Sequence, residues 1–228
     1  PSEQLLLKTY LSNYEVTFEN SGAFGGDVDT YLKVTTDPIT PVVFDEVNQQ
    51  IQKGVSLITF FGHASTDGFD QNIDNPDNWG NYGRYPVVLG LGCFAGDIHQ
   101  PYTTSASEKF IILPDQGGIA FLSTVKIGFT NGLDKFTEQF YEGFCNTLYG
   151  ESIGKLTQYS KSQSNSASHI SESGSIGNFS IQGDPAICLN SHNNPELVVD
   201  ESRVFLTPEE ITVATDSFDV NIVVTNLG

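Results

Sequence analysis

Three nearly continuous apolar segments constrain the fold of this chain most strongly. They are VSLITFF at 55–61, PVVLGLG at 86–92 and GGIAFLS at 117–123. Apolar runs of this kind are typical of strands that are buried on both faces of a parallel sheet. Helical patterns separate and follow them: a capping box opens residues 105–113, and large apolar residues recur every fourth position at Phe136, Phe140, Phe144 and Leu148. This order of strands and helices predicts an α/β fold in which helices flank a mostly parallel sheet.

The segments on either side of this region carry weaker patterns. Residues 2–13 have a leucine stripe that predicts a short helix, and the alternating residues 14–20 predict a strand. A second helix is expected over 41–54, because proline is favoured at the first helical position and glycine at the end. Residues 151–162 are interpreted as a further helix, and the serine-rich residues 163–176 as a flexible loop.

The last part of the chain has a different texture. Residues 193–228 are dense in Val, Ile and Thr and alternate without a helical period, which indicates an all-β segment. We interpret it as the first strands of an Ig-like β-sandwich that is too short to close by itself. The predicted domains are therefore 1–192 and 193–228.

Composition excludes several classes of function. The chain has 10 Lys and Arg against 28 Asp and Glu, a formal net charge of −18. A surface this acidic repels phosphate backbones and anionic lipid, so binding to nucleic acid and membrane insertion are not expected. The 228 residues contain no Met, and no apolar run is long enough to span a bilayer. We expect the chain to be a piece of a larger protein.

Chemically reactive side chains directly follow two of the apolar segments. His63 comes after the run at 55–61, and Cys93 comes after the run at 86–92. Because parallel strands end at the same edge of a sheet, an imidazole and a thiol are expected there, and together they form the minimal pair for acyl transfer. Taken singly, Cys93 is also consistent with a structural thiol and His63 with a turn residue. Cys145 and Cys188 are interpreted as core residues, since both lie in apolar patterns.

An ordered set of short motifs resembles one known family. Gly62–Ser65 (GHAS) resembles the GHGS motif of gingipain-type cysteine peptidases, and Cys93–Asp97 resembles their C-x-x-G-D nucleophile motif. The similarity covers roughly residues 2–190 and continues through Ser107-Glu108, Gly117–Ala120, Gly154 and Gly183–Pro185. The chain is thus identified as resembling peptidase family C25, whose members share a caspase-like, three-layer fold.

The resemblance implies roles for particular residues. Cys93 would be the nucleophile and His63 the acid and base, with the backbone N–H groups of Ala64 and Cys93 as the oxyanion hole. Ala64 departs from the family glycine, and an Ala would misalign the hole if the family geometry requires positive φ. The carboxylate that orients the His lies upstream of the first helix in the family, and Glu3 is the nearby candidate. The segment 124–131 resembles the wall of the substrate pocket, with Phe129 as a lining residue.

Metal and cofactor predictions are limited. Thiol chemistry needs no cofactor, and none is predicted for catalysis. The loop that follows the motif around His63 carries oxygen ligands at alternating positions, as calcium loops do, and structural calcium is an expectation at Asp70, Asn72 and Asp74. A plain solvated loop is the alternative. A metal-dependent hydrolase built on His63, Asp67 and His99 is the remote alternative to thiol chemistry.

The function predicted from these observations is a cysteine-type endopeptidase that hydrolyses peptide bonds through a thioester acyl-enzyme. It would act on protein or peptide substrates and, like the family that it resembles, be secreted or located at the cell surface. Two alternatives stay open: a sortase-like transpeptidase of the type IX secretion system, and a non-catalytic surface or adhesion module with the same fold. The oligomeric state is not predicted.

Overall fold

The computed structural model divides into two compact units, Pro1–Leu189 and Asn190–Gly228. The structure describes residues 3–21, 26–33, 41–70, 73, 75–101, 104–164, 169–189, 197–199, 203–213 and 215–226.

A four-stranded sheet forms the centre of the first unit, in the order β1-β4-β5-β6. The three predicted strands are confirmed as β1 (Leu57–Phe61), β4 (Val87–Leu91) and β5 (Ala120–Thr124), and they run parallel to one another. The edge strand β6 (Phe179–Gly183), which is antiparallel to β5, is not among the predicted strands. The sheet is therefore mostly parallel, as expected.

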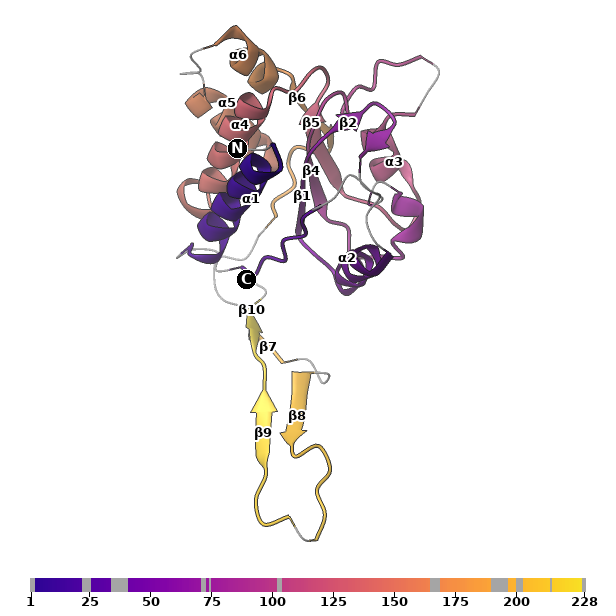
Figure 1. Cartoon of the computed structure of the whole chain (residues 1–228), viewed down its shortest axis with the longest axis vertical. Coiled ribbons are helices and arrows are strands. Elements are labelled where there is room, and N and C mark those ends of the chain that lie inside the picture. The colour runs from indigo at the N-terminus through magenta and orange to yellow at the C-terminus, as the bar shows by residue number, and fades with distance from the viewer. Residues whose placement is uncertain are drawn as a thin grey trace. The chain divides into compact units, whose positions relative to one another are not determined.

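Helices cover both faces of this sheet and make a three-layer α/β unit (Figure 1). In β4, Leu89 and Leu91 pack into the cluster beneath one helical layer, whereas Val88 packs into the other. This alternation explains why β4 is buried throughout and lacks polar residues. The first layer holds α1 (Glu3–Glu19), α4 (Thr130–Glu142) with its π-helical extension η2 (Gly143–Thr147), α5 (Ile153–Gln163) and α6 (Ile170–Gly177), and the second holds α2 (Pro41–Lys53) and α3 (Ala106–Ile112).

The strand predicted at residues 14–20 is wrong, because α1 continues through this segment to Glu19. Tyr14 and Phe18 lie one helical turn apart, and both are buried. The Tyr14 ring stacks on Tyr141 with 5.2 Å between the ring centroids, while Val16 between them is 58% exposed. The apolar residues therefore follow the helical period as well as the alternation of a strand, and packing on α4 selects the helix.

The flexible loop predicted at 163–176 is also partly wrong, because α6 begins at Ile170. Small residues bring α6 close to α4: a Cβ added to Gly132 would lie 2.7 Å from the Ser175 Cβ. Serine and glycine here serve close helix packing rather than flexibility. Residues 165–168 lie outside the described part of the chain.

The other predicted helices are confirmed. Helix α2 ends at Lys53, before Gly54 with its φ of +102°. Helix α3 has the predicted capping box between Ser105 and Glu108. The buried Trp79 ring packs against Phe110, with 5.0 Å between the centroids, at the end of the short 3₁₀ helix η1 (Pro76–Asn78).

The second unit is all-β where it is described. Strand β7 (Leu197–Val198) pairs with β10 (Thr225–Asn226), and β8 (Val204–Thr207) pairs with β9 (Asp219–Ile222), both antiparallel. The predicted boundary follows residue 192, and the compact units divide after Leu189. The Ig-like character of the segment stays a prediction. Within the described residues, no helix combines the length and apolarity needed to cross a bilayer.

Candidate active site

The pairing of β1 with β4 brings the segments of His63 and Cys93 to one edge of the sheet. The two strands are parallel, with Phe61 opposite Leu91, and each reactive residue follows its strand by two positions. The Gly62 N–H donates to the Leu91 carbonyl oxygen at 3.1 Å. This bond extends the hydrogen bonding between β1 and β4 by one residue. The two segments therefore leave the carboxyl edge of the sheet side by side, where parallel sheets bind their ligands.

Glycine at position 92 allows these two segments to touch. A Cβ added to Gly92 would lie 2.5 Å from the Ala64 Cβ, 3.0 Å from the Gly62 oxygen and 3.2 Å from the Ala64 nitrogen. No larger residue fits there without displacing the backbone on either side of His63. The close approach is a reason for glycine directly before Cys93.

His63 lies at the start of a small hairpin formed by β2 (Ala64–Ser65) and β3 (Gly68–Phe69). Its carbonyl oxygen accepts the Asp70 N–H at 3.0 Å, which fixes its backbone. Its side chain is 73% exposed, and its Nε2 lies 3.5 Å from Oε2 of Glu3 in the first turn of α1. The structure therefore brings the carboxylate named in the sequence analysis next to the imidazole.

Ring stacking holds α1 against the strand that ends at this site. The Tyr10 ring stacks on Phe61, the last residue of β1, with 5.7 Å between the centroids. Its hydroxyl donates to Asn131 Oδ1 of α4 at 3.4 Å. Helix α1, which supplies Glu3, is thus anchored to Phe61, two residues before His63.

Ala64 does not adopt the backbone conformation that would require glycine. It lies in β2 opposite Phe69, in extended backbone. The neighbouring bond from Asp70 N–H to His63 oxygen marks a hydrogen-bonded pair, and such pairs alternate in an antiparallel ladder. The Ala64 N–H therefore points away from β3. The departure from the family glycine is compatible with this geometry.

Cys93 is partly buried, and its Sγ lies 3.7 Å from the Gly128 carbonyl oxygen. Phe94 directly after it has a φ of +60°, a left-handed conformation that is uncommon for a bulky residue and often marks a functional site. The Phe94 N–H donates to the Lys126 oxygen at 2.9 Å. The turn that carries the thiol is therefore tied to the loop after β5.

Asp97 of the C-x-x-G-D motif stabilises the same turn. Its carboxylate is buried and accepts the His99 N–H at 3.2 Å and the Gln100 Nε2 at 2.7 Å. The bond from Gln100 is the main reason why the pKa of Asp97 lies below its usual value. Both oxygens are engaged within the loop, which indicates a structural role for this carboxylate.

The segment 124–129 forms a wall beside the thiol. The buried Thr124 hydroxyl lies 2.6 Å from the Gly92 oxygen and 3.0 Å from the Lys126 oxygen. Phe129 is 50% exposed, and its N–H donates to Ser175 Oγ at 2.8 Å. The resemblance assigns residues 124–131 to the wall of the substrate pocket but does not single out Gly128, because a contact through a backbone carbonyl leaves no signal in residue type.

The other two cysteines differ from each other. Cys145 lies in the core, as predicted, and burial raises the pKa of its thiol to about 12. Cys188 was expected in the core but is exposed. The run around it is extended, so Ile187 and Leu189 pack on the core while Cys188 between them faces outward. This prediction is therefore wrong for Cys188.

Metal binding finds little support in the described part of the chain. None of its His, Cys, Asp and Glu residues form a group of three that could hold a metal ion, so the alternative built on His63, Asp67 and His99 has no support. Asp70 already faces a cation, because Lys33 Nζ lies 3.1 Å from its carbonyl oxygen and 3.9 Å from Oδ2. The other calcium candidates, Asn72 and Asp74, lie outside the described residues.

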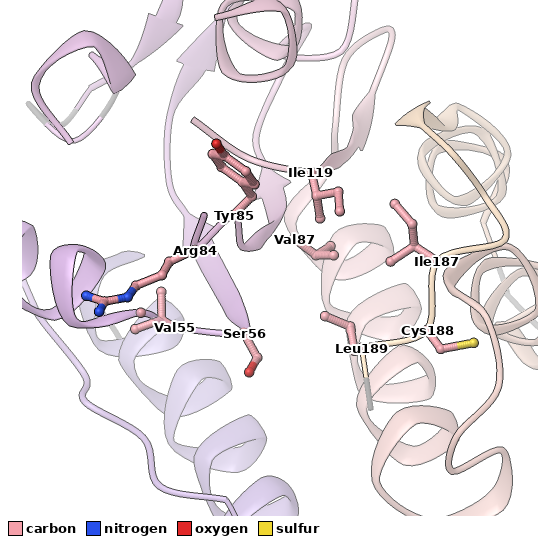
Figure 2. A pocket seen from close by; sticks show the side chains of 10 residues that line it. Val55, Ser56, Arg84, Tyr85, Val87, Ile119, Ile187, Cys188 and Leu189 are labelled. Atoms are coloured by element: carbon pink, nitrogen blue, oxygen red, sulfur yellow. The ribbon is translucent and has the colours of Figure 1, made fainter. Parts of the chain in front are cut away.

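An open pocket of about 310 Å³ lies at the opposite edge of the sheet (Figure 2). Ser56 before β1, Val87 at the start of β4 and Ile119 before β5 line it, so it sits at the amino ends of these strands. Neither His63 nor Cys93 contributes to it. This pocket is distinct from the edge that carries the imidazole and the thiol.

Comparisons with known proteins identify a family and a shared fold. A sequence model of peptidase family C25 matches residues 1–190. The fold is similar to that of gingipain R (RgpB), described as an Arg-specific cysteine proteinase, with a TM-score of 0.62 and 13% identity over 89% of this chain and 47% of that chain. It is also similar to the complex of the pro- and mature domains of RgpB from Porphyromonas gingivalis, with a TM-score of 0.63 and 12% identity over 89% of this chain and 48% of that chain.

A third similar structure is described only as a protease, with a TM-score of 0.65 and 11% identity over 86% of this chain and 49% of that chain. The chain thus spans about half the length of the solved structures that it resembles. No curated protein matches it. At these identities the structural likeness concerns the fold.

Proposed function

The chain belongs to peptidase family C25, and on this basis we propose that it is a cysteine endopeptidase in which Cys93 and His63 form the catalytic dyad. One observation carries the proposal. The register of β1 and β4 places both residues two positions past paired strand ends, in segments that touch at Gly92. A thiol and an imidazole at one sheet edge form a nucleophile and acid/base pair.

The proposed reaction has two steps. Cys93 Sγ, as the thiolate, attacks the carbonyl carbon of the scissile peptide bond, and the protonated His63 donates its proton to the leaving amine. The C–N bond breaks and a thioester remains on Cys93. His63 then removes a proton from water, which attacks the thioester carbonyl. The carboxylic acid product leaves, and the Cys93 thiolate and protonated His63 are restored.

The backbone N–H groups of Ala64 and Cys93 are proposed to bind the oxyanion in both steps. In support, the Ala64 N–H points away from β3, and the Ala64 nitrogen lies beside Gly92, the residue before the nucleophile. Donors that are held by the backbone need no reorganisation when charge develops on the substrate oxygen.

Glu3 is proposed as the carboxylate that positions the imidazole. Its Oε2 lies 3.5 Å from His63 Nε2, which leaves Nδ1 for the proton exchange with Cys93 and the leaving amine. Both side chains are more than half exposed, so Glu3 acts mainly by orienting the ring. This interaction completes a triad in which α1 supplies the third member.

The wider setting of the protein is proposed from the family. The substrates are proteins or peptides, the enzyme acts outside the cell or at its surface, and no cofactor takes part in the thiol chemistry. Structural calcium stays a prediction at Asp70, Asn72 and Asp74, and Lys33 Nζ lies 3.9 Å from Oδ2 of Asp70.

The three cysteines provide an internal test of the dyad. The folded protein is treated with limiting iodoacetamide from about pH 5 to pH 9, and alkylation of each cysteine is measured by mass spectrometry. Cys188 is the exposed control and Cys145 the buried one. We expect Cys93 to react fastest at low pH, and His63→Ala to remove this advantage over Cys188. If Cys93 reacts no faster than Cys188, the dyad is not assembled, and the non-catalytic alternative is favoured.

Hydrolysis and transfer are separated by the products. Peptide cleavage is followed with and without a peptide that offers a free amine, and the products are identified by mass spectrometry. An endopeptidase yields the free acid in both cases. A ligated product in the presence of the amine would favour the transpeptidase alternative, because the same thioester is then attacked by the amine instead of water.

A further inference from the structure

The wall beside Cys93 carries exposed apolar side chains and defines the substrate class. We infer that this site prefers a large apolar side chain on the acyl-side residue, the residue whose carbonyl the thiol attacks. The inference rests on the proposed function, since it assigns specificity to the proposed thiol.

The wall lies within reach of that side chain. Gly128 contacts the thiol through its carbonyl oxygen, which lies 3.7 Å from Cys93 Sγ. A Cβ added to Gly128 would lie 3.1 Å from the Gly92 oxygen, so the wall also packs on the residue before the nucleophile. Ile127 and Phe129 flank Gly128 on its two sides. A substrate carbonyl held at Cys93 would bring its own side chain to this segment.

The side chains of Ile127 and Phe129 are exposed to solvent. Ile127 and Phe129 are each 50% exposed, and Ile98 in the loop after Cys93 is 44% exposed. Exposed apolar side chains in segments next to a reactive group are candidates for a substrate-binding surface. Together they offer apolar area that a substrate side chain would remove from water.

The wall is held rigidly before substrate arrives. The N–H of Phe129 donates to Ser175 Oγ of α6, and the Phe129 oxygen accepts the Leu133 N–H at 3.0 Å, which starts α4. At the other end, the Thr124 hydroxyl contacts the oxygens of Gly92 and Lys126. A surface that is ordered in advance loses less entropy on binding and discriminates better.

Charge near the thiol disfavours a basic acyl-side residue. From Thr124 to Phe129 the single charged residue is Lys126, and from Gly92 to His99 the single acidic residue is Asp97. Asp97 is buried, and both its oxygens are engaged by the loop. A guanidinium or ammonium group beside this wall would be repelled by Lys126 and would find no free carboxylate in either segment, because the exposed carboxylate of Glu3 lies beside His63. An acidic residue would be attracted by Lys126, but the net charge of −18 would repel it.

The test compares matched fluorogenic peptides that differ only in the acyl-side residue: Leu, Phe, Arg, Lys or Asp. We expect kcat/KM for Leu and Phe to exceed that for Arg, Lys and Asp by about tenfold or more. Phe129→Ala should reduce the Phe and Leu rates, and Ile127→Glu should move the preference toward Arg and Lys. Ile112→Glu is the matched control, because Ile112 is 67% exposed at the end of α3 and should leave the profile unchanged.

The outcomes separate the two proposals. Faster cleavage after Arg, Lys or Asp, or equal rates for all five, overturns the specificity and leaves the peptidase proposal standing. Labelling of Cys93 by peptidyl acyloxymethyl ketones with the same five residues is the second readout, since it needs only the first step. If no peptide is cleaved and Cys93 reacts with none of the five labels, both the specificity and the proposed function are wrong. Circular dichroism checks that each variant is folded.

Discussion

Gly92 lies against Ala64 so closely that a Cβ on Gly92 would be 2.5 Å from the Ala64 Cβ. This contact joins the segment of the nucleophile to the segment of the histidine. It also accounts for the pair of small residues at these two positions. The two methyl positions exclude each other, so the chain can carry a Cβ at 64 only while 92 is glycine.

Gly92→Ala should therefore displace Ala64 and its N–H, and lower both activity and stability. We expect kcat/KM to fall by about 100-fold, on the order of the loss of one oxyanion donor. The double variant Ala64→Gly with Gly92→Ala removes the shortest contact and should recover part of this loss, although the contacts of 3.0 and 3.2 Å to the Gly62 oxygen and the Ala64 nitrogen remain. Peptide hydrolysis and thermal melts provide the measurements. A double variant no better than Gly92→Ala would contradict the contact.

Glu3→Gln should lower activity without changing the fold. The carboxylate at 3.5 Å from His63 Nε2 orients the ring, and an amide does so less well. Because both side chains are more than half exposed, we expect kcat/KM to fall by about tenfold or less, with the same melting temperature. Glu15→Gln, twelve residues further along α1, is the control. Full activity in Glu3→Gln would remove Glu3 from the triad.

The position of His63 and Cys93 at one edge of the sheet could be predicted from the sequence, because local patterns determine it, and their catalytic roles stay a prediction. The apolar runs predicted β1 and β4 correctly. Because the carboxyl ends of parallel strands lie at the same edge of a sheet, His63 and Cys93 were expected at one edge, where the structure has them. The motif resemblance added Ala64 as a backbone donor and Glu3 as a carboxylate. These predictions depend on residues that lie within a few positions of a strand end or a helix start.

The missed features depend on contacts between distant segments. The alternation of residues 14–20 fits a strand, and only the partners Tyr141 and Phe144 on the neighbouring helical segment show that Tyr14 and Phe18 belong to a helix. The approach of Gly128 to Cys93 is made by a backbone oxygen and has no side-chain signature. Sequence patterns report which side chains seek burial, but not which segment will cover them.

The Tyr14–Asp134 contact predicts a pH dependence of stability. The Tyr14 hydroxyl donates to Asp134 Oδ1 at 2.6 Å between α1 and α4, with Glu138 and Lys135 as the charged neighbours. Burial is the main cause that raises the pKa of Asp134 to about 6 from 3.8. Because the folded value is the higher one, this group's contribution to stability is complete below about pH 4 and is lost as the pH rises through 6.

Urea unfolding of the wild type and Asp134→Asn at about pH 4.5 and pH 7.5 measures this contribution. The wild type should lose stability relative to Asp134→Asn between the two pH values, on the order of 1 kcal/mol after allowance for partial exposure. Comparing the two proteins at each pH cancels the titration of the other carboxylates. A free-energy difference that stays constant with pH would show that Asp134 titrates alike in the folded and unfolded states.

Thr124 links the nucleophile to the wall, and its hydroxyl should matter more than its shape. The buried side chain contacts the oxygens of Gly92 and Lys126, so Thr124→Val removes a donor from the buried Gly92 oxygen, whereas the Lys126 oxygen still accepts the Phe94 N–H. We expect Thr124→Val to cost about 1–3 kcal/mol of folding free energy. It should also reduce kcat/KM by about tenfold at temperatures where it is fully folded, because the turn of Cys93 and the wall can then move apart.

Thr124→Ser keeps the donor and should retain most of the activity. Chemical unfolding measures the stability of both variants. The rate of peptide hydrolysis, divided by the concentration of Cys93 that reacts with an active-site label, gives the activity per folded molecule. The informative comparison is between these two variants at a fully buried site. Thr124→Val replaces the hydroxyl by a methyl group, whereas Thr124→Ser keeps the hydroxyl and removes the methyl group. If Thr124→Val is less stable but equally active per folded molecule, then Thr124 supports only the fold and the wall is positioned by the contact between Phe129 and Ser175 instead.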